Sequence, residues 1–369
     1  MAARAAVVAT GHRAATRRGA LAWVGSHAAA TADPDEGARL AVAAVDEALR
    51  SLGLGLDDLV RVGAYYDEAL DDGRVRAAVR EALPARSRPV LNLLPVREPA
   101  VPGAALVLDA AAATGPRTPF GKGDVPDAVR VGDWIWIGGT RGDGDGIFAQ
   151  TRSIIDRLRA LTAEAGAELD DCVKMNISYV GDGTEADWEP TARLRASAFR
   201  EPAAAATGIP YPRLPGGART QFEVLAVAGS TGTRRHGWPV GHWDWPIHLP
   251  WKHGCRAGEL VTVGGQVSLD GRGRPIDPGD LARQTDTALG NIGRVLATVG
   301  AGMADVTQVT AFYEGTPADL ETILARTRGA FGPEPPALVP VPLPFLAYEE
   351  MVVEIEVIAV APSASASTA

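Results

Sequence analysis

The segment QTDTALGNIGRVLATVGAGMADVTQVTAFYE, residues 284–314, decides the fold because two other segments share its design. They are ARLAVAAVDEALRSLGLGLDDLVRVGAYYDE, residues 38–68, and QTRSIIDRLRALTAEAGAELDDCVKMNISYV, residues 150–180. In each segment, apolar residues at helical spacing are followed by a turn with glycine, an aspartate and a run typical of a β-strand. The pattern predicts three copies of one helix–turn–strand unit.

The strands that flank these units keep a constant spacing. Upstream of each helix, a predicted strand ends in a pair of small residues, in LAWVGSH, WIWIGGT and LVTVGGQ. Downstream, each copy closes with a strand that carries an acid. The acid follows the aspartate after the helix by 51, 52 and 51 residues: Asp58 to Asp109, Asp171 to Glu223, and Asp305 to Glu356.

This regularity predicts an α+β protein of three tandem modules, each a mixed sheet with two helices. The expected modules are residues 1–112, 113–230 and 231–361. The remaining residues, 362–369, read PSASASTA and are expected to form a disordered tail, because small polar residues bury too little apolar surface.

Two segments rich in glycine and proline, residues 111–130 and 228–254, are predicted to be linkers between modules. The second holds four of the eight tryptophans and four of the six histidines of the chain. The spacing of these histidines matches no zinc-site pattern, so we expect no metal. Nothing else in the sequence indicates a cofactor.

The composition restricts the classes of partner. Of 369 residues, 46% are hydrophobic and 22% charged, as in globular proteins. No apolar run reaches the roughly 20 residues of a membrane span, so no membrane partner is expected. The formal net charge of −9 argues against a nucleic acid partner. The chain has only two cysteines, Cys172 and Cys255, and its first residues do not resemble a leader peptide. Both features suggest a cytoplasmic protein.

The third module resembles the reactive-intermediate deaminase (Rid, YjgF-type) family. The residues that carry the resemblance are VTVGGQ, the helix start QT, GAGMADV and the closing strand VEIEVIA. The second module keeps this pattern and the first is degenerate. Members with a single module assemble as homotrimers with ligand sites between subunits. The resemblance therefore implies three Rid/chorismate-mutase-like modules that form an intrachain pseudo-trimer, with further dimerisation left open.

In the family, the clefts bind small imines or enamines that carry a carboxylate and hydrolyse them to a ketone and ammonia. An arginine in the motif P-A-R-[ST] binds the carboxylate, and the first glutamate of E-I-E holds or activates a water. Arg86 and Glu354 match these positions. The other modules carry neutral residues there: Ala206 and Leu338 for the arginine, Val107 and Gln221 for the glutamate.

Modules two and three also resemble the chorismatases, relatives that hydrolyse chorismate and release pyruvate. The resemblance lies in PAAAATGI of module two and in the terminal VEIE. It implies that Glu354 is the catalytic acid and that Thr207 and Gly208 line the cleft. Chorismatases carry an arginine ahead of the last module, near the place of His248. We therefore predict one specialised cleft, between modules two and three.

The remaining candidates follow from the glutamine that ends the family motif VTVGGQ. That residue is Gln266 in module three, and His27 takes its place in module one, so both are predicted to contact substrate together with Gly265. A plain hydrogen-bonding role for His27 and a surface role for Arg86 are alternatives that stay open. Glu356 is expected to be structural, because an acid recurs at its position in every module.

The resulting prediction is a Rid-superfamily enzyme that acts on a small imine, enamine or unsaturated carboxylate in specialised metabolism. The reaction would be a deamination, a hydrolysis or a related elimination or cyclisation. One alternative is a chorismatase-like hydrolase that releases pyruvate. Another is a non-catalytic ligand-binding or scaffold protein. A ribonuclease, a label sometimes attached to the family, fits poorly with the acidic net charge.

Overall fold

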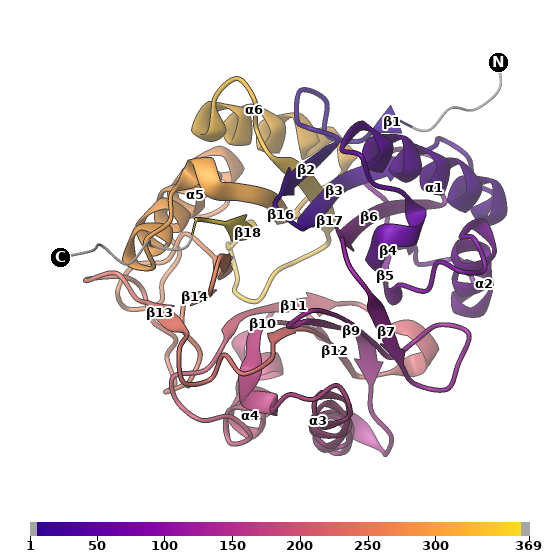
Figure 1. Ribbon diagram of the computed structural model, residues 1–369. Coiled ribbons are helices and arrows are strands. Elements are labelled where there is room, and N and C mark those ends of the chain that lie inside the picture. Colours follow the sequence, from indigo (N-terminus) through magenta and orange to yellow (C-terminus); the bar gives the residue numbers. More distant parts are fainter. Residues whose placement is uncertain (1–5, 363–369) are drawn as a thin grey trace.

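The computed structural model describes residues 6–362 and consists of three six-stranded sheets around a common centre. Two helices cover the outer side of each sheet, and the strands face the middle of the molecule (Figure 1). The predicted α+β class with three tandem modules is confirmed. Of the predicted disordered tail, all but Pro362 lies outside the described residues.

The first sheet has the strand order β1-β3-β6-β4-β5, with β2 paired to β3. Strands β4 and β5 are parallel, and the other neighbours are antiparallel. The elements are β1 (Ala6–Val7), β2 (Ala15–Arg18), β3 (Leu21–Ala28), α1 (Pro34–Ser51), η1 (Leu56–Asp58), β4 (Leu59–Asp67), α2 (Asp72–Ala82), β5 (Val90–Val96) and β6 (Leu106–Ala113).

The second sheet has the order β11-β10-β12-β9-β8-β7. Its elements are β7 (Arg117–Phe120), β8 (Ala128–Val131), β9 (Trp134–Arg141), α3 (Gly146–Glu164), η2 (Leu169–Asp171), β10 (Cys172–Val180), α4 (Glu185–Ala196), β11 (Ala205–Tyr211), η3 (Pro215–Gly217) and β12 (Thr220–Val227). Residues 111–130, predicted to be a linker, therefore contain two strands of this sheet. A tight turn at Gly132, with φ of 58°, folds β8 back onto β9 and forms the hairpin.

The third sheet has the order β13-β14-β15-β18-β16-β17. Its elements are β13 (Arg235–Gly237), β14 (Gly254–Ala257), β15 (Leu260–Gln266), α5 (Leu281–Thr298), η4 (Met303–Asp305), β16 (Val306–Glu314), η5 (Pro317–Asp319), α6 (Leu320–Phe331), β17 (Ala337–Leu343) and β18 (Val353–Val360). The predicted linker 228–254 supplies the short edge strand β13. The rest of this segment is mainly a loop without regular structure.

The aspartate that follows the first helix of each module has the same local role. In module three, Asp305 Oδ2 accepts a hydrogen bond of 2.9 Å from the backbone N–H of Gly302. Asp58 and Asp171 accept equivalent bonds of 2.9 and 3.0 Å. Each aspartate closes a 3₁₀ turn that leads into the central strand, so the repeat of this residue is structural.

The modules meet through a pair of small residues within each of β3, β9 and β15. A β-carbon on the first glycine of each pair would lie unusually close to a backbone oxygen of a neighbouring module. The distances would be 3.1 Å from Gly25 to Leu338 O, 2.8 Å from Gly138 to Leu91 O, and 2.4 Å from Gly264 to Ala206 O. Glycine thus permits the close approach of strands from two modules, most strictly at Gly264.

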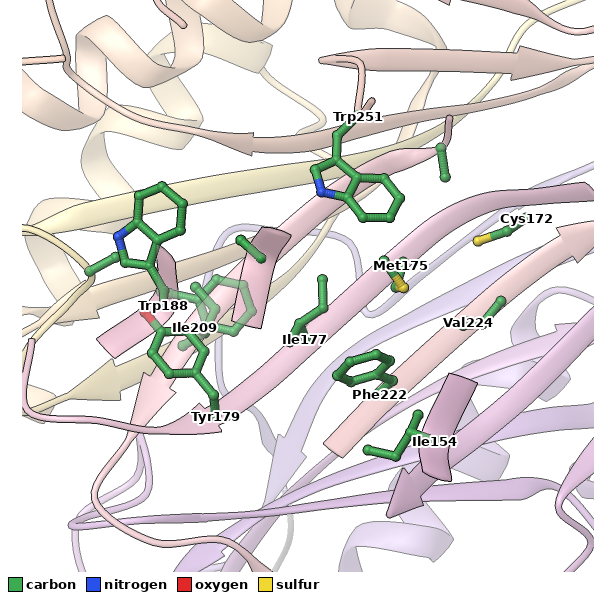
Figure 2. Packing of buried hydrophobic residues seen from close by; sticks show 14 of the residues in the cluster. Ile154, Cys172, Met175, Ile177, Tyr179, Trp188, Ile209, Phe222, Val224 and Trp251 are labelled. Atoms are coloured by element: carbon green, nitrogen blue, oxygen red, sulfur yellow. The ribbon is translucent and has the colours of Figure 1, made fainter. Parts of the chain in front are cut away.

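The hydrophobic core of module two continues into module three. Figure 2 shows residues of β10, β11, β12 and α3 packed together, with Trp251 of the loop 228–254 lying over them. The same buried cluster includes Phe312 of β16 and Met351 beside β18. Both cysteines are buried and form no disulfide. The loop therefore holds the two modules together through apolar contacts.

Candidate functional site

A cavity lies at the junction of modules two and three. Module two contributes residues of β10, α4 and β11, and module three contributes residues of β15, β18 and the loop 228–254. The polar side chains among them include Glu354 and Arg195, and the walls are mainly apolar, with six aromatic residues: Tyr179, Trp188, Trp243, Trp245, Trp251 and Tyr348.

Glu354 lies in β18 and is only 7% exposed. Burial and the neighbouring charge of Glu356 raise the pKa of its carboxyl group to about 8, against the opposing effect of Lys174. Among the described residues, Glu354 forms no ion pair. A carboxyl group in this state is largely protonated at neutral pH and can donate a proton to a bound molecule.

Gly265 makes room for this carboxyl group. A β-carbon at Gly265 would lie 1.7 Å from Glu354 Oε1, so the carboxyl group would have to move from its place. The N–H of Gly265 donates to Thr207 Oγ1 at 2.9 Å. This amide is therefore already hydrogen-bonded, and the Thr207 hydroxyl helps to join β15 to β11.

Lys174 connects the same hydroxyl to the second acid of β18. Its Nζ lies 2.5 Å from Thr207 Oγ1 and 2.7 Å from Glu356 Oε2. This pairing opposes the effect of burial and lowers the pKa of Glu356. Glu356 is consequently ionised, and its negative charge favours the protonated form of Glu354.

Arg195 is a functional candidate that the sequence reasoning missed. It is 4% exposed and lies near the end of α4, where its Nη1 donates to Thr191 Oγ1 at 3.1 Å. Among the described side chains, which exclude residues 185–187, no carboxylate pairs with it. Burial lowers its pKa to about 10, so it remains a cation at neutral pH. A buried guanidinium without a counter-ion suits an anionic ligand.

A sequence signal for Arg195 did exist. Trp188, Ala192 and Arg195 stand at positions i, i+4 and i+7, which share one face of a helix. All three line the cavity. An arginine on the apolar face of a helix is unusual, and that position would have identified it as a candidate.

The aromatic walls also offer polar atoms. The rings of Trp188 and Tyr348 lie 6.0 Å apart and those of Trp243 and Trp245 lie 5.2 Å apart, measured between centroids. Within the described part of the chain, the indole nitrogens of Trp188 and Trp243 are buried without a hydrogen-bond partner. They are available to a ligand that carries acceptor atoms.

Of the residues predicted to form the site, Glu354, Gly208 and Gly265 line this cavity, and Thr207 lies beside it. Gln266 does not line it. Its side chain is fully buried and is directed to histidines of the loop, 2.8 Å from His242 Nε2 and 3.3 Å from His253 Nδ1.

The other three predicted residues lie elsewhere. The side chain of His248 is 80% exposed and contacts Glu201 at 3.0 Å. His27 is buried in β3 of module one, with Nδ1 2.8 Å from the carbonyl oxygen of Gly25. Neither residue lines the cavity, so the structure does not bring them together with Glu354.

Arg86 also lies outside the cavity. Its side chain is 79% exposed and pairs with Asp57 at 2.5 Å, because a turn ahead of β5 directs it to the surface. The strand pairing places Leu91 of β5 where Ala206 stands in β11. The arginine position of the family therefore falls on Leu91 in module one, and the proposed match to Arg86 is wrong.

The corresponding positions at the other two junctions carry no acid. At the junction of modules one and two, Gln221 takes the place of Glu354 and donates to Asn92 Oδ1 at 2.8 Å. In module one, Val107 takes this place and packs among apolar residues such as Val8 and Ala28. Of these three equivalent positions, only the one in module three can donate a proton.

The histidines of the loop 228–254 do not form a metal site. The rings of His242 and His253 lie 4.4 Å apart, and burial lowers the pKa of His253 to about 3, so that ring is neutral. Throughout the described residues, no three His, Cys, Asp or Glu side chains are arranged to hold a metal. Nor does this part of the chain contain a helix with the length and apolar character needed to cross a membrane.

Three α+β modules around a centre, with a buried acid at one junction, define a Rid-type architecture fused into one chain. Residues 246–361 match the family model described as Endoribonuclease L-PSP. A RutC family protein of Pyrococcus horikoshii is 30% identical over 112 residues, which are 30% of this chain and 86% of that protein. The chain belongs to this RutC (YjgF-type) family.

Two further similarities agree with this assignment. A RutC family protein of Pyrococcus abyssi is 29% identical over 110 residues, 30% of this chain and 85% of that protein. Among solved structures, a chorismatase is similar over 82% of this chain and 93% of its own, with a TM-score of 0.55 and 18% identity. At this identity, the likeness shows a shared fold and nothing finer.

Proposed function

We propose that the chain is an enzyme with one active site, at the junction of modules two and three. Its substrate is the imine or enamine of a small monocarboxylate, which it hydrolyses to a carbonyl compound and ammonia. The observation that carries the proposal is the presence of Glu354 and Arg195 in one cavity. One is a buried acid that holds its proton and the other a buried cation without a counter-ion.

Each residue has a separate task in this reaction. Arg195 binds the substrate carboxylate and fixes its orientation. Glu354 donates its proton to the enamine carbon or the imine nitrogen, which gives an iminium ion that water attacks. The Glu354 carboxylate then takes a proton from that water and passes it to the amino group; ammonia leaves as the carbonyl group forms, and the proton of the new hydroxyl group returns to Glu354. A pKa of about 8 suits a group that both donates and recovers a proton near neutral pH.

The walls support a preference for apolar substrates. Arg195 is the one cationic side chain among the described residues that line the cavity, so it matches a single carboxylate. The four tryptophans and two tyrosines around it bury apolar surface and stack against planar groups. Imines of phenylalanine, tryptophan or leucine fit these walls better than the imine of a small polar amino acid.

A chorismatase-like hydrolysis is the second candidate, because the fold of a chorismatase matches most of the chain. The same Glu354 would then protonate the substrate, and pyruvate would be released. Chorismate carries two carboxylates, whereas the described lining offers one cation. The balance of charge therefore favours the imine hydrolase.

The test is a continuous assay for ammonia and pyruvate. An amino-acid oxidase generates imines in situ from phenylalanine, tryptophan, leucine and serine, and chorismate and isochorismate complete the panel. We expect ammonia release above the spontaneous rate, greatest with the aromatic imines and lost in Glu354→Gln. Pyruvate release would support the chorismatase reaction instead. No release from any compound by the wild type would contradict both enzymatic functions and favour a ligand-binding protein.

A matched pair of variants tests the role of Arg195. Arg195→Gln is expected to raise KM at least about tenfold, because a charged hydrogen bond to the substrate contributes roughly 1.5–3 kcal/mol. Arg193→Gln changes an exposed arginine of the same helix that pairs with Glu189, and it should leave the kinetics unchanged. Equal effects of both changes would exclude a specific role for Arg195.

A further inference from the structure

A second cavity lies where the three sheets meet, and strands of all three modules line it. Each module contributes the acid of its closing strand: Asp109 of β6, Glu223 of β12 and Glu356 of β18. The three modules share a second position in this cavity. It lies on the central strand of each module (β4, β10 or β16) and pairs with the closing-strand residue that stands two places after the acid. It is Arg61 in module one, Lys174 in module two and Gln308 in module three.

Each cationic side chain reaches the acid of the following module. Arg61 Nε lies 2.5 Å from Glu223 Oε1, and Lys174 Nζ lies 2.7 Å from Glu356 Oε2. By the same rule, the third member of the ring would reach Asp109. That member is the neutral Gln308, and its Nε2 donates to a backbone oxygen of β3 instead, at 3.2 Å.

Asp109 therefore lacks partners that the other two acids have. Glu223 accepts a further bond from Asn92 at 2.8 Å, and Glu356 accepts one from Asn176 at 2.9 Å. Asp109 is bound by Arg61 of its own module, through Oδ2 alone. Its Oδ1 is buried without a hydrogen-bond partner, and the whole residue is 2% exposed.

The charges in this cavity do not balance. Three carboxylates face two cationic side chains, and Asp109 and Glu223 share Arg61, so one negative charge remains; the oxygen without a hydrogen-bond partner in this pair is Asp109 Oδ1. Burying a charge without compensation is costly, so something must neutralise it. Burial and the charges of Glu223 and Glu356 also raise the pKa of Asp109.

We propose that the central cavity binds one small monovalent cation, such as potassium, sodium or ammonium, at Asp109. One charge is uncompensated, which matches a monovalent ion. A divalent metal normally takes several carboxylates, and no group of three acidic, His or Cys side chains in the described part of the chain is arranged for one. Asn176 Oδ1, which is also buried without a partner, and the Thr310 hydroxyl supply further oxygen atoms to the cavity.

The cation would supply the positive charge that a basic side chain at position 308 would bring, in line with Arg61 and Lys174 at the two equivalent positions. It would bind oxygen atoms from different modules and would thereby stabilise the closed arrangement of all three. This role is separate from the imine chemistry proposed above, because the two cavities share no lining residue.

The experiment compares thermal unfolding of the full chain in different chloride salts at equal ionic strength. N-methyl-D-glucamine chloride is the reference, because its cation is too large for the cavity. Potassium, sodium and ammonium chloride are the probes, and the salt with the largest effect identifies the preferred cation. We expect a saturable rise in Tm of about 3 °C for the wild type, as for a ligand bound only by the folded state.

Three variants make the result specific. Gln308→Lys places a cation in the ring, so its Tm should be independent of the salt and at least equal to that of the wild type with saturating salt. Gln308→Met leaves the charge uncompensated and should keep the salt dependence. Asp109→Asn removes the charge and should lose it. Equal Tm values for the wild type in all four salts, or a dependence that survives in Asp109→Asn, would overturn the proposal in favour of a proton on Asp109.

Discussion

Replacing Glu354 with glutamine should stabilise the protein at neutral pH while it abolishes activity. Glutamine has the shape of a protonated glutamic acid and carries no charge. In the folded wild type the pKa of Glu354 is about 8, against 4.5 as the ordinary value of a glutamate. The folded state therefore retains a proton that the unfolded chain releases above pH 4.5. Its contribution to stability is complete below that pH and is lost as the pH rises towards 8.

The magnitude follows from the size of this shift. Each pH unit between the two pKa values removes about 1.4 kcal/mol of stability, so the loss at pH 7 is roughly 3 kcal/mol. It approaches roughly 5 kcal/mol above pH 8. Glu354→Gln avoids this loss because it does not titrate. The variant should thus exceed the wild type in stability by an amount that grows with pH.

The assay is urea denaturation of both proteins at several values between pH 5 and pH 9. The difference in the free energy of unfolding isolates Glu354, because every other titrating group is common to the two proteins. A difference that does not depend on pH would refute the raised pKa. A variant that is less stable than the wild type at pH 8 would show that Glu354 is held ionised by its surroundings, and Glu354 could not then be the proton donor.

Further predictions concern the neighbours of this acid. Gly265→Ala should abolish activity and destabilise the fold by at least about 2 kcal/mol, because the new β-carbon would collide with the Glu354 carboxyl group; Gly271→Ala, at an open position, should be neutral in thermal unfolding. Lys174→Met should cost roughly 3–5 kcal/mol in urea denaturation, because it leaves a buried carboxylate without its partner. The same variant should shift the pH at which activity is lost upwards, since Lys174 lowers the pKa of Glu354. An unchanged pH profile would separate Lys174 from the reaction.

The predicted fold followed from features that sequence carries directly. The period of the three helix–turn–strand units and the aspartate that closes each turn reflect contacts within one module. Such contacts join residues at fixed separations, so they leave a regular pattern along the chain. Strands β7 and β8 were missed because each is only four residues long and lies in a segment with many turn residues.

The candidate site was only partly accessible to this reasoning. Glu354 was predicted from a motif, and the structure places it in a cavity beside Gly208 and Gly265. Arg86 was matched to the family motif from the order of residue types alone, without knowledge of the strand register. The register of β5, which is a property of the folded sheet, assigns that position to Leu91. A loop of different length between motif and strand is enough to cause such an error.

The sequence by itself determined the module, its three copies and the acid at the end of the last strand. The tertiary structure alone decided which side chains of different modules face one another. Arg195 becomes a candidate because residues of α4 and β18 line one cavity, and Asp109 has no cation of its own because Gln308 takes the place of a third basic side chain and Arg61 is shared with Glu223. The physical reason is that a charge is compensated or isolated by its neighbours in space. Arg195 and Glu354 are 159 residues apart and Asp109 and Gln308 are 199 apart, separations that no local pattern records.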